Sequence, residues 1–249
     1  MNKVITSRQN PLIKRIRSLS DRKFRDKFSE YVADGVKSVK EAFLTGQTVS
    51  VLLTTERYQG YFEDFCGVKE VVSEELFRYV SEEENPQGVL AVVKKPDLKL
   101  KPVSSDCLFL DGVRDPANVG AIIRTAAATG ITEIFAADCA DAYSGKAVRA
   151  SMSGIFRVNV YAGTKEELLP LVKCPVIVAD MDGEDVFKTT LKGNFCLALG
   201  NEGSGVSEEV KNAAKNTVAV PMRKGFESLN VAVAAGITLY ALLNNRKGE

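Results

Sequence analysis

Short apolar runs alternate with segments of helical periodicity through the second half of this chain, and this alternation constrains the fold more than any other feature. Each run is short enough for a fully buried strand. Strands that alternate with helices form mostly parallel sheets with helices on both faces, so the pattern predicts an α/β fold. Ligands of such sheets bind beyond the carboxyl ends of the strands. The apolar runs cover residues 107–110, 131–137, 156–161, 176–179, 195–199 and 217–220, and the helical segments cover residues 119–129, 165–172, 207–215 and 229–244.

A smaller α/β unit is predicted in the first part of the chain. Apolar runs at residues 51–53, 68–72 and 89–93 alternate there with helical patterns at residues 36–44 and 74–80. Residues 94–102 then contain two prolines, four lysines and no core pattern, which is typical of an exposed linker. We therefore expect a basic N-terminal helix and a small domain over residues 1–95, a linker over residues 96–106 and a larger domain over residues 107–249.

Composition excludes several classes of protein. Hydrophobic residues make up 45% of the 249 residues, enough for a sizeable core. The longest apolar stretch, residues 231–243, is shorter than the roughly 18 residues that span a bilayer, and the N-terminus lacks the continuous apolar core of a secretion signal. We expect no membrane contact and a cytoplasmic location. The five cysteines are odd in number and widely spaced, which indicates reduced thiols and argues against a disulfide framework or structural zinc.

The chain contains no histidine, and this absence restricts its chemistry. Histidine is the commonest general base and the commonest metal ligand in proteins. Any catalysis must therefore proceed without imidazole, and we expect no metal.

The first thirty residues are strongly basic although the whole chain has a net charge of only +1. They hold nine Lys or Arg residues against three acids, a net charge of +6, so the remainder carries −5. Asn10 and Pro11 are typical of a helix start, and the apolar residues that follow recur at helical spacing. This basic amphipathic helix predicts contact with a polyanion such as nucleic acid, and a solvated helix face is the alternative.

The glycine-rich run from Leu199 to Glu209 links a predicted strand to a predicted helix. Gly200, Gly203 and Gly205 allow turns and close backbone approach, and Ser207 is suited to cap the helix. The spacing lacks the order of the dinucleotide fingerprint and the lysine of a phosphate-binding loop. An ordinary turn and a ligand-binding loop both remain open on this run alone.

Two further loops have the same character. Residues 111–120 lead into a helix in which Arg124 lies among Ala, Ile and Thr, so its guanidinium must either extend to the surface or face an anion. Asn118 at the start of that helix is a cap or a ligand contact. In the loop over residues 219–230, either Ser228 or Asn230 could cap the long apolar helix that follows.

Taken in order, three segments resemble the motifs of the SpoU/TrmH class of RNA ribose 2′-O-methyltransferases. The resemblance extends to residues 146–152 and, less distinctively, to residues 7–14 and the small domain, so it covers nearly the whole chain. The three segments are Asp111-Gly-Val-Arg-Asp-Pro-Ala-Asn-Val-Gly-Ala-Ile-Ile-Arg124, Leu199-Gly-Asn-Glu-Gly-Ser-Gly-Val206, and Val220-Pro-Met with Ser228-Leu-Asn-Val-Ala-Val-Ala234.

This resemblance implies a SPOUT fold, in which a mostly parallel sheet carries a C-terminal trefoil knot, beside a smaller ribosomal-protein-like α/β domain. It also implies S-adenosylmethionine as cofactor and a homodimer built around the site. Ala117 and Ala232 depart from the commoner family residues, but neither change removes a reactive group. The implied cofactor-binding residues are Leu199, Gly200, Val220, Met222 and Leu229, and the implied catalytic positions are Asn118, Arg124, Glu202, Ser228 and Asn230.

The implied activity is methylation of a ribose 2′-hydroxyl in structured RNA, with 23S rRNA preferred over tRNA as substrate. Family proposals let the residue at Arg124 remove the hydroxyl proton. Because a guanidinium has a pKa above roughly 12, we expect Arg124 instead to position a phosphate and to stabilise charge on oxygen. The alternatives are a tRNA 2′-O-methyltransferase, a non-catalytic RNA-binding protein of the same fold, and an α/β enzyme that binds a nucleotide phosphate at the glycine-rich run.

Overall fold

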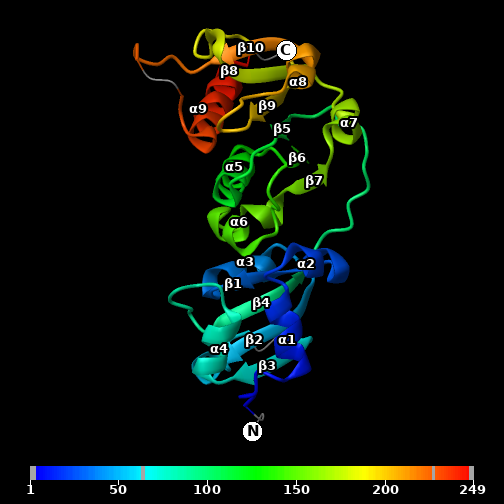
Figure 1. The fold of residues 1–249 in the computed structure, drawn as a ribbon, viewed down its shortest axis with the longest axis vertical. Coiled ribbons are helices and arrows are strands. Elements are labelled where there is room, and N and C mark those ends of the chain that lie inside the picture. The colour runs from blue at the N-terminus through cyan, green and yellow to red at the C-terminus, as the bar shows by residue number, and fades with distance from the viewer. Residues whose placement is uncertain (1–3, 63–64, 226–227, 247–249) are drawn as a thin grey trace.

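Two β-sheets lie one beyond the other along the long axis of the molecule (Figure 1). The computed structural model describes residues 4–62, 65–225 and 228–246. Lys3 of the basic segment and Phe226 and Glu227 of the third loop lie outside the described residues. The N-terminal part of the chain builds the smaller sheet and the C-terminal part builds the larger one.

The smaller sheet has four strands in the order β1-β4-β2-β3. β4 pairs antiparallel with β1 and β2, and β2 pairs parallel with β3. Asn10 caps α1 by accepting a hydrogen bond from the Leu12 N–H, as the Asn-Pro start suggests. The helices and strands predicted here are present, whereas α2 and β1 were not predicted. The elements are α1 (Pro11–Ser18), α2 (Arg22–Phe28), β1 (Glu30–Asp34), α3 (Val36–Leu44), β2 (Val49–Thr55), a 3-10 helix (Glu56–Tyr58), β3 (Val68–Val72), α4 (Glu74–Val80) and β4 (Val89–Lys94).

The larger sheet has six strands in the order β10-β8-β9-β5-β6-β7, and every neighbouring pair is parallel. The predicted α/β fold with a mostly parallel sheet is therefore confirmed. The elements are β5 (Cys107–Asp111), α5 (Pro116–Thr129), β6 (Glu133–Ala137), α6 (Gly145–Ala150), a 3-10 helix (Gly154–Arg157), β7 (Asn159–Gly163), α7 (Lys165–Leu168), a 3-10 helix (Leu169–Leu171), β8 (Val176–Asp185), β9 (Cys196–Gly200), α8 (Glu208–Ala213), β10 (Ala214–Ala219) and α9 (Val231–Asn244).

Several predicted element boundaries in this part differ from the structure by two residues or more, and three of them have a direct structural cause. The helix expected over residues 165–172 ends at Leu168 and continues as a 3-10 helix that contains Pro170, because proline has no N–H to continue the α-helical ladder. The helix expected over residues 207–215 ends at Ala213, since the next residues pair with β8 as strand β10. The strand expected over residues 156–161 begins only at Asn159, after the 3-10 helix Gly154–Arg157.

Two predicted helix caps also differ from the structure. Ser207 lies at the N-cap of α8, but its hydroxyl makes no capping hydrogen bond, and its backbone N–H donates to Asp111 Oδ2 at 2.7 Å instead. The cap of α5 is Asp115, which accepts a hydrogen bond from the Ala117 N–H, so Asn118 does not cap this helix. Asn230 caps α9 through the N–H groups of Ala232 and Val233.

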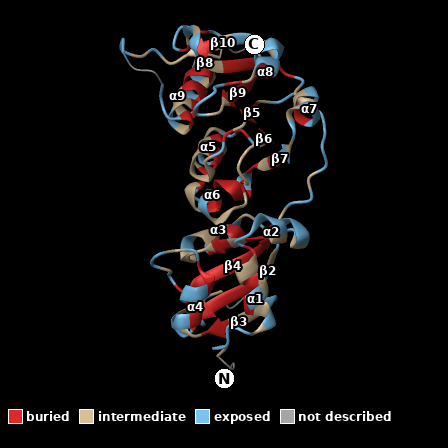
Figure 2. Cartoon of the chain, in the orientation of Figure 1, coloured by how far each residue is buried: buried red, intermediate tan, exposed pale blue. Residues whose placement is uncertain are grey.

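The two parts of the chain share a buried interface. Tyr31 of β1 packs against Tyr143, with 4.9 Å between ring centroids, and also contacts Phe156. The Gln47 side chain donates to the Phe156 carbonyl at 3.1 Å across the same junction. Figure 2 shows buried residues in both sheets and in the elements between them. Within the described residues, none of the helices has the length and apolar character needed to cross a membrane.

Candidate active site

A cleft of about 920 Å³ lies at the carboxyl edge of the larger sheet, where β9 and β10 end and α9 begins. This volume is within the roughly 300–1,000 Å³ typical of small-molecule and cofactor sites. The cleft therefore lies where the strand pattern predicts a ligand. Its walls combine apolar side chains, the backbone of residues 200–205 and a few polar groups.

All five residues predicted to bind the cofactor line this cleft. Leu199 and Gly200 end β9, Val220 and Met222 follow β10, and Leu229 precedes α9. Three segments that are separate in sequence thus meet around one cavity, because the parallel strands end at the same edge of the sheet.

Gly200 has a structural reason to be glycine. A Cβ at this position would lie 2.2 Å from the Gly205 carbonyl carbon and 2.3 Å from the Val206 nitrogen. The loop folds back here because Asn201 and Gly205 exchange two backbone hydrogen bonds of 3.0 Å, and Gly205 adopts a φ of +69°. The backbone that lies against Gly200 is therefore the protein's own.

The side chain of Asn201 organises this loop, and the sequence argument missed it. Asn201 Oδ1 accepts from the Gly203 and Ser204 N–H groups, and its Nδ2 donates to the Gly112 carbonyl at 2.8 Å. The neighbouring Asp111, which is buried, accepts from the Ser207 N–H. Both contacts attach the glycine-rich loop to the end of β5. An asparagine that follows a strand and precedes two glycines was the available signal.

Three predicted catalytic residues form one chain of hydrogen bonds, of which Glu202 lines the cleft and Asn118 and Asn230 lie outside its lining. Asn118 Nδ2 donates to Glu202 Oε1 at 2.7 Å, and Asn230 Nδ2 donates to Asn118 Oδ1 at 3.0 Å. Because Asn118 donates to a carboxylate and accepts from an amide, its side-chain orientation is defined. Ser228, the fourth of these residues, also lines the cleft.

Arg124 is the exception. Its side chain is exposed, it is absent from the cleft lining, and it forms no hydrogen bond or ion pair with any residue that the structure describes. Six positions separate it from Asn118 on α5, which places the two side chains about 120° apart around the helix axis. The Arg124 backbone lies beside Gly154, whereas Thr125 neighbours Gly236 of α9. The structure therefore does not bring Arg124 to the other site residues of its own chain.

An ion pair that the sequence argument did not single out also lines the cleft. Lys211 Nζ of α8 lies 2.9 Å from Asp180 Oδ2 of β8. Burial raises the pKa of Asp180, but the hydrogen bond and the charge of Lys211 outweigh burial and lower it overall. Both groups are thus charged at neutral pH. No sequence signal identified this pair, because its members lie on separate elements.

The cleft contains groups that can bind an organic cofactor. Within the ranges that the structure describes, no group of three or more His, Cys, Asp or Glu side chains could hold a metal ion. Apolar walls at Leu199, Val220 and Leu229 suit an aromatic base, and loop backbone and polar side chains supply hydrogen bonds.

Comparisons with known proteins find matches to both parts of the chain. Residues 106–240 match the SpoU rRNA Methylase family, and residues 10–91 match the MRM3-like substrate binding domain. The chain is 31% identical to the 23S rRNA (guanosine(2553)-2′-O)-methyltransferase RlmP of Bacillus subtilis over 96% of this chain and 99% of that protein.

Solved structures are similar over nearly the whole chain. An AdoMet-bound rRNA methyltransferase from Sinorhizobium meliloti is 29% identical, with a TM-score of 0.85 and coverage of 96% of both chains. The SpoU methyltransferase AviRb from Streptomyces viridochromogenes, in complex with AdoMet, is 27% identical, with a TM-score of 0.85 over 94% of this chain and 97% of that chain.

Proposed function

Because the chain belongs to the SpoU rRNA methylase family, we propose that it transfers a methyl group from S-adenosylmethionine to a ribose 2′-hydroxyl of 23S rRNA. One observation carries the proposal. Asn118 of α5, Glu202 of the loop after β9 and Asn230 at the N-cap of α9 form a hydrogen-bonded chain that reaches the cleft through Glu202. All five predicted cofactor residues line this cleft. The B. subtilis relative is named as a 23S rRNA methyltransferase, and the match covers 96% of the present chain. This supports rRNA over tRNA as the substrate.

The cleft residues fit S-adenosylmethionine. Leu199, Val220 and Leu229 would enclose the adenine, and the backbone around Gly200 would supply hydrogen bonds to the nucleoside. The cofactor carries a methyl group on a positively charged sulfur, which an oxygen nucleophile can displace. AdoMet-bound structures of similar proteins from S. meliloti and S. viridochromogenes support this assignment.

The residues of the site then have mainly a positioning task. A displacement requires the attacking oxygen, the methyl carbon and the sulfur in line, with the reacting atoms about 3 Å apart. The Asn118–Glu202–Asn230 chain would present fixed donors and acceptors to the ribose, because each amide is held by another side chain. Arg124 would hold a neighbouring phosphate and stabilise negative charge on the oxygen, since a guanidinium does not serve as a base.

The proposed enzyme is a homodimer, and the position of Arg124 supports this. Val233 and Tyr240 expose about half of their surface on one face of α9, and Leu229 is also exposed. Large apolar side chains grouped on a surface are typical of protein interfaces. A dimer built on this face could supply Arg124 of one protomer to the cleft of its partner, which would complete a site that one chain leaves open.

We propose three further properties that follow from the family. The C-terminal segment is expected to form a trefoil knot. Residues 1–95 are proposed to form the RNA-binding domain, residues 96–106 the linker and residues 107–249 the catalytic domain, in keeping with the two matched segments. An rRNA substrate would place the enzyme in the cytoplasm.

Isothermal titration calorimetry with S-adenosylmethionine, ATP and NAD tests the cofactor. Binding of S-adenosylmethionine alone is expected, whereas binding of ATP or NAD would support a nucleotide enzyme, and no binding at all would support a pure RNA-binding protein. Arg124→Ala should abolish methyl transfer and leave cofactor affinity within a few fold, because Arg124 lies outside the cleft. Arg124→Lys keeps the positive charge and so tests whether the planar guanidinium itself is required. Full turnover by Arg124→Ala would contradict its assigned role.

A further inference from the structure

A second cavity lies where the two parts of the chain meet. It has a volume of about 500 Å³ and is distinct from the cofactor cleft, because the two share no lining residue. We call it the junction groove. It lies at the carboxyl ends of β6 and β7 and is bordered by α2. Its lining includes Arg22 of α2, Arg114 of the β5–α5 loop, Asp138, Asp141, Tyr143 and Gly163.

Two arginines from opposite sides of the junction line this groove, and neither forms a strong ion pair with the described residues. Arg114 is exposed and forms no hydrogen bond or ion pair with any residue within the described part of the chain. Among the described residues, the one ion pair of the Arg22 guanidinium is with Asp26 on its own helix, at 3.6 Å, and both side chains are more than half exposed. Exposed pairs of this kind contribute at most about 1 kcal/mol, so Arg22 can turn to another anion.

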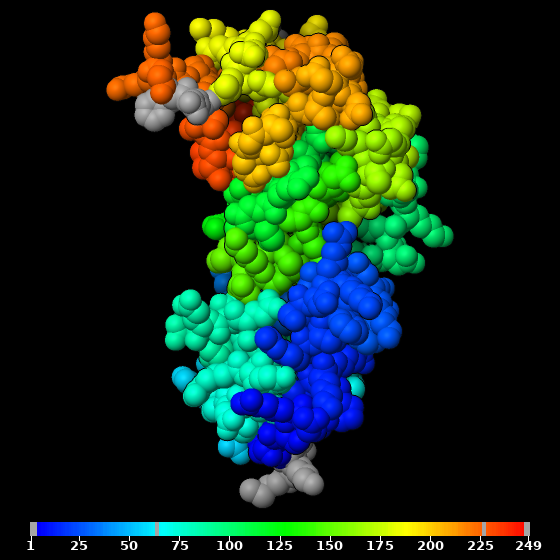
Figure 3. Space-filling view, viewed as in Figure 1, coloured from blue at the N-terminus to red at the C-terminus, as the bar shows by residue number. Residues whose placement is uncertain are grey.

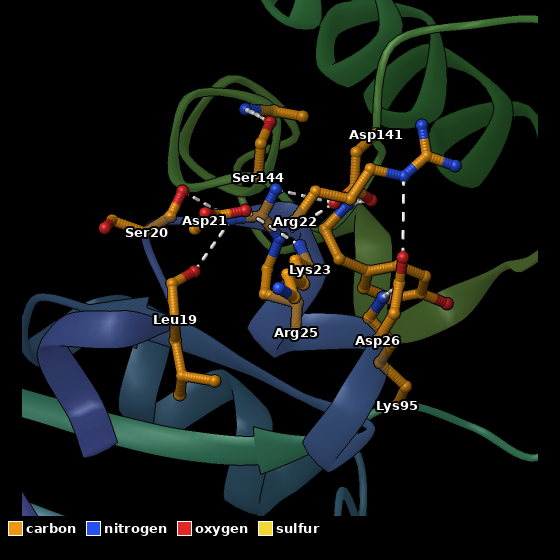
Figure 4. A network of polar contacts seen from close by, with 12 residues as sticks. Leu19, Ser20, Asp21, Arg22, Lys23, Arg25, Asp26, Lys95, Asp141 and Ser144 are labelled. Carbon is orange, nitrogen blue, oxygen red and sulfur yellow. Dashed lines mark hydrogen bonds and ion pairs between the residues drawn. The ribbon is translucent and has the colours of Figure 1, made fainter.

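A buried arginine holds α2 in place beside the groove. Arg25 is only 4% exposed, and its guanidinium bonds Asp141 Oδ2 at 2.7 and 2.8 Å and the carbonyls of Leu19 and Ser20 at 2.7 Å (Figure 4). Figure 3 shows the N-terminal segment, in blue, directly against the catalytic part, in green. Because α2 is anchored, Arg22 is carried at a fixed distance from the catalytic part instead of on a flexible arm.

The acids of the groove leave a net positive charge. Asp141 is compensated by Arg25, so Asp138 is the carboxylate that remains against Arg22 and Arg114. Asp138 adopts a φ of +52°, in the left-handed region that aspartate and asparagine tolerate best after glycine. The small side chains of Ala136, Ala140 and Ala162 leave room beside the guanidinium groups. The planar guanidinium of arginine, with its paired N–H donors, matches the geometry of a phosphate.

One loop connects the groove to the active site. Arg114 and Asn118 both lie in the segment between the end of β5 and the first turn of α5. Gly112 of the same segment accepts a hydrogen bond from Asn201 of the cofactor cleft. An anion held by Arg114 would therefore have a defined position relative to Asn118.

We propose that the junction groove binds a backbone phosphate of the RNA substrate through Arg22 and Arg114. This inference rests on the proposed RNA substrate and extends it, because it assigns the contact to a groove shared by both parts of the chain. The phosphate lies away from the reacting ribose, and the two arginines fix where the RNA crosses from the small domain to the active site.

RNA binding by the full-length protein tests the proposal directly. The double variant Arg22→Ala/Arg114→Ala is compared with the unaltered protein in filter binding to transcribed 23S rRNA at several salt concentrations. At low salt the variant should bind roughly tenfold more weakly, and the slope of log K against log salt should fall by about 0.7–0.9, the value for one lost phosphate contact. Asp138→Asn should bind RNA more tightly, because it removes a repelling carboxylate.

The double variant Lys192→Ala/Lys215→Ala is the matched control. Both lysines are exposed and lie outside the groove, the cleft lining and residues 1–95, so their loss also removes two positive charges. An unchanged RNA affinity in Arg22→Ala/Arg114→Ala, or an equal loss in Lys192→Ala/Lys215→Ala, would overturn the groove assignment. Calorimetry with S-adenosylmethionine should give the same affinity for all variants and so show that they fold. Failure of the unaltered protein to methylate 23S rRNA would count against the proposed function instead, since RNA binding is measured separately.

Discussion

Substitution of the glycines in the loop after β9 gives a graded test of the cleft geometry. In Gly200→Ala the new methyl group would overlap backbone atoms of Gly205 and Val206 at 2.2–2.4 Å, well inside any real contact. Flexible side chains could move away, but these atoms belong to a loop closed by two backbone hydrogen bonds. Overpacking costs about 1–3 kcal/mol, and we expect the upper end of this range because backbone must shift.

Two neighbouring glycines provide matched controls. A Cβ at Gly205 meets nothing within 4 Å, so Gly205→Ala carries only the cost of its positive φ, about 1–2 kcal/mol. Gly203 has no positive φ, and its Cβ would lie 3.5 Å from Asn201 Oδ1, which is ordinary contact. Gly203→Ala should therefore change the free energy of unfolding by less than about 0.5 kcal/mol.

Urea unfolding and calorimetry with S-adenosylmethionine measure the series. The loss of stability should follow the order Gly200→Ala, Gly205→Ala, Gly203→Ala. Cofactor affinity should fall more than about tenfold in Gly200→Ala, because the displaced loop lines the cleft. Equal losses of stability at all three positions, or normal cofactor affinity in Gly200→Ala, would refute the reasoning.

Three other predictions concern the junction and the dimer. Arg25→Ala should lower the free energy of unfolding by about 3 kcal/mol in urea titrations, because it leaves the Asp141 carboxylate, whose side chain is only 12% exposed, without its charge partner. Arg22→Ala should change it by less than about 0.5 kcal/mol. Burial raises the pKa of Asp34 from 3.8 to about 6, so the folded protein retains a proton on this carboxyl that the unfolded chain releases. The stability that this retained proton contributes is present below about pH 4 and is lost as the pH rises through 6. Asp34→Asn should flatten that pH dependence by up to about 3 kcal/mol, and an unchanged slope would count against this account. If each site is shared between two protomers, an equal mixture of inactive Arg124→Ala and Glu202→Ala chains should recover about a quarter of the wild-type methyl transfer once the subunits have exchanged. No recovery would place both residues in the site of one chain.

The parallel sheet could be predicted because its evidence is local. Each buried strand is a short apolar run, and the alternation with helices determines that neighbouring strands run parallel. The meeting of Leu199, Val220 and Leu229 at one cleft was also predictable, since parallel strands end at one edge of the sheet. The order of the six strands was not predicted, because it depends on pairings between residues far apart in the chain.

The roles of individual polar residues could be predicted less well from the sequence. Arg25 counted as one positive charge of a basic segment, but it is buried because Asp141, far along the chain, supplies its partner. Asn118 could have been a helix cap until Asp115 was seen to cap α5. The resemblance placed Arg124 among the catalytic residues, whereas the helix directs it away from them within one chain. In each case the deciding contact joins residues that are distant in sequence.

Transfer of labelled methyl groups to RNA tests the central claim most directly. The protein is incubated with methyl-labelled S-adenosylmethionine and with unmodified 23S rRNA or tRNA, and the RNA is digested to nucleosides. We expect the label in a single 2′-O-methylated nucleoside of 23S rRNA and none in tRNA. Label on a base, or no transfer to RNA by a protein that binds the cofactor, would contradict the assignment of this cleft as a ribose methyltransferase site.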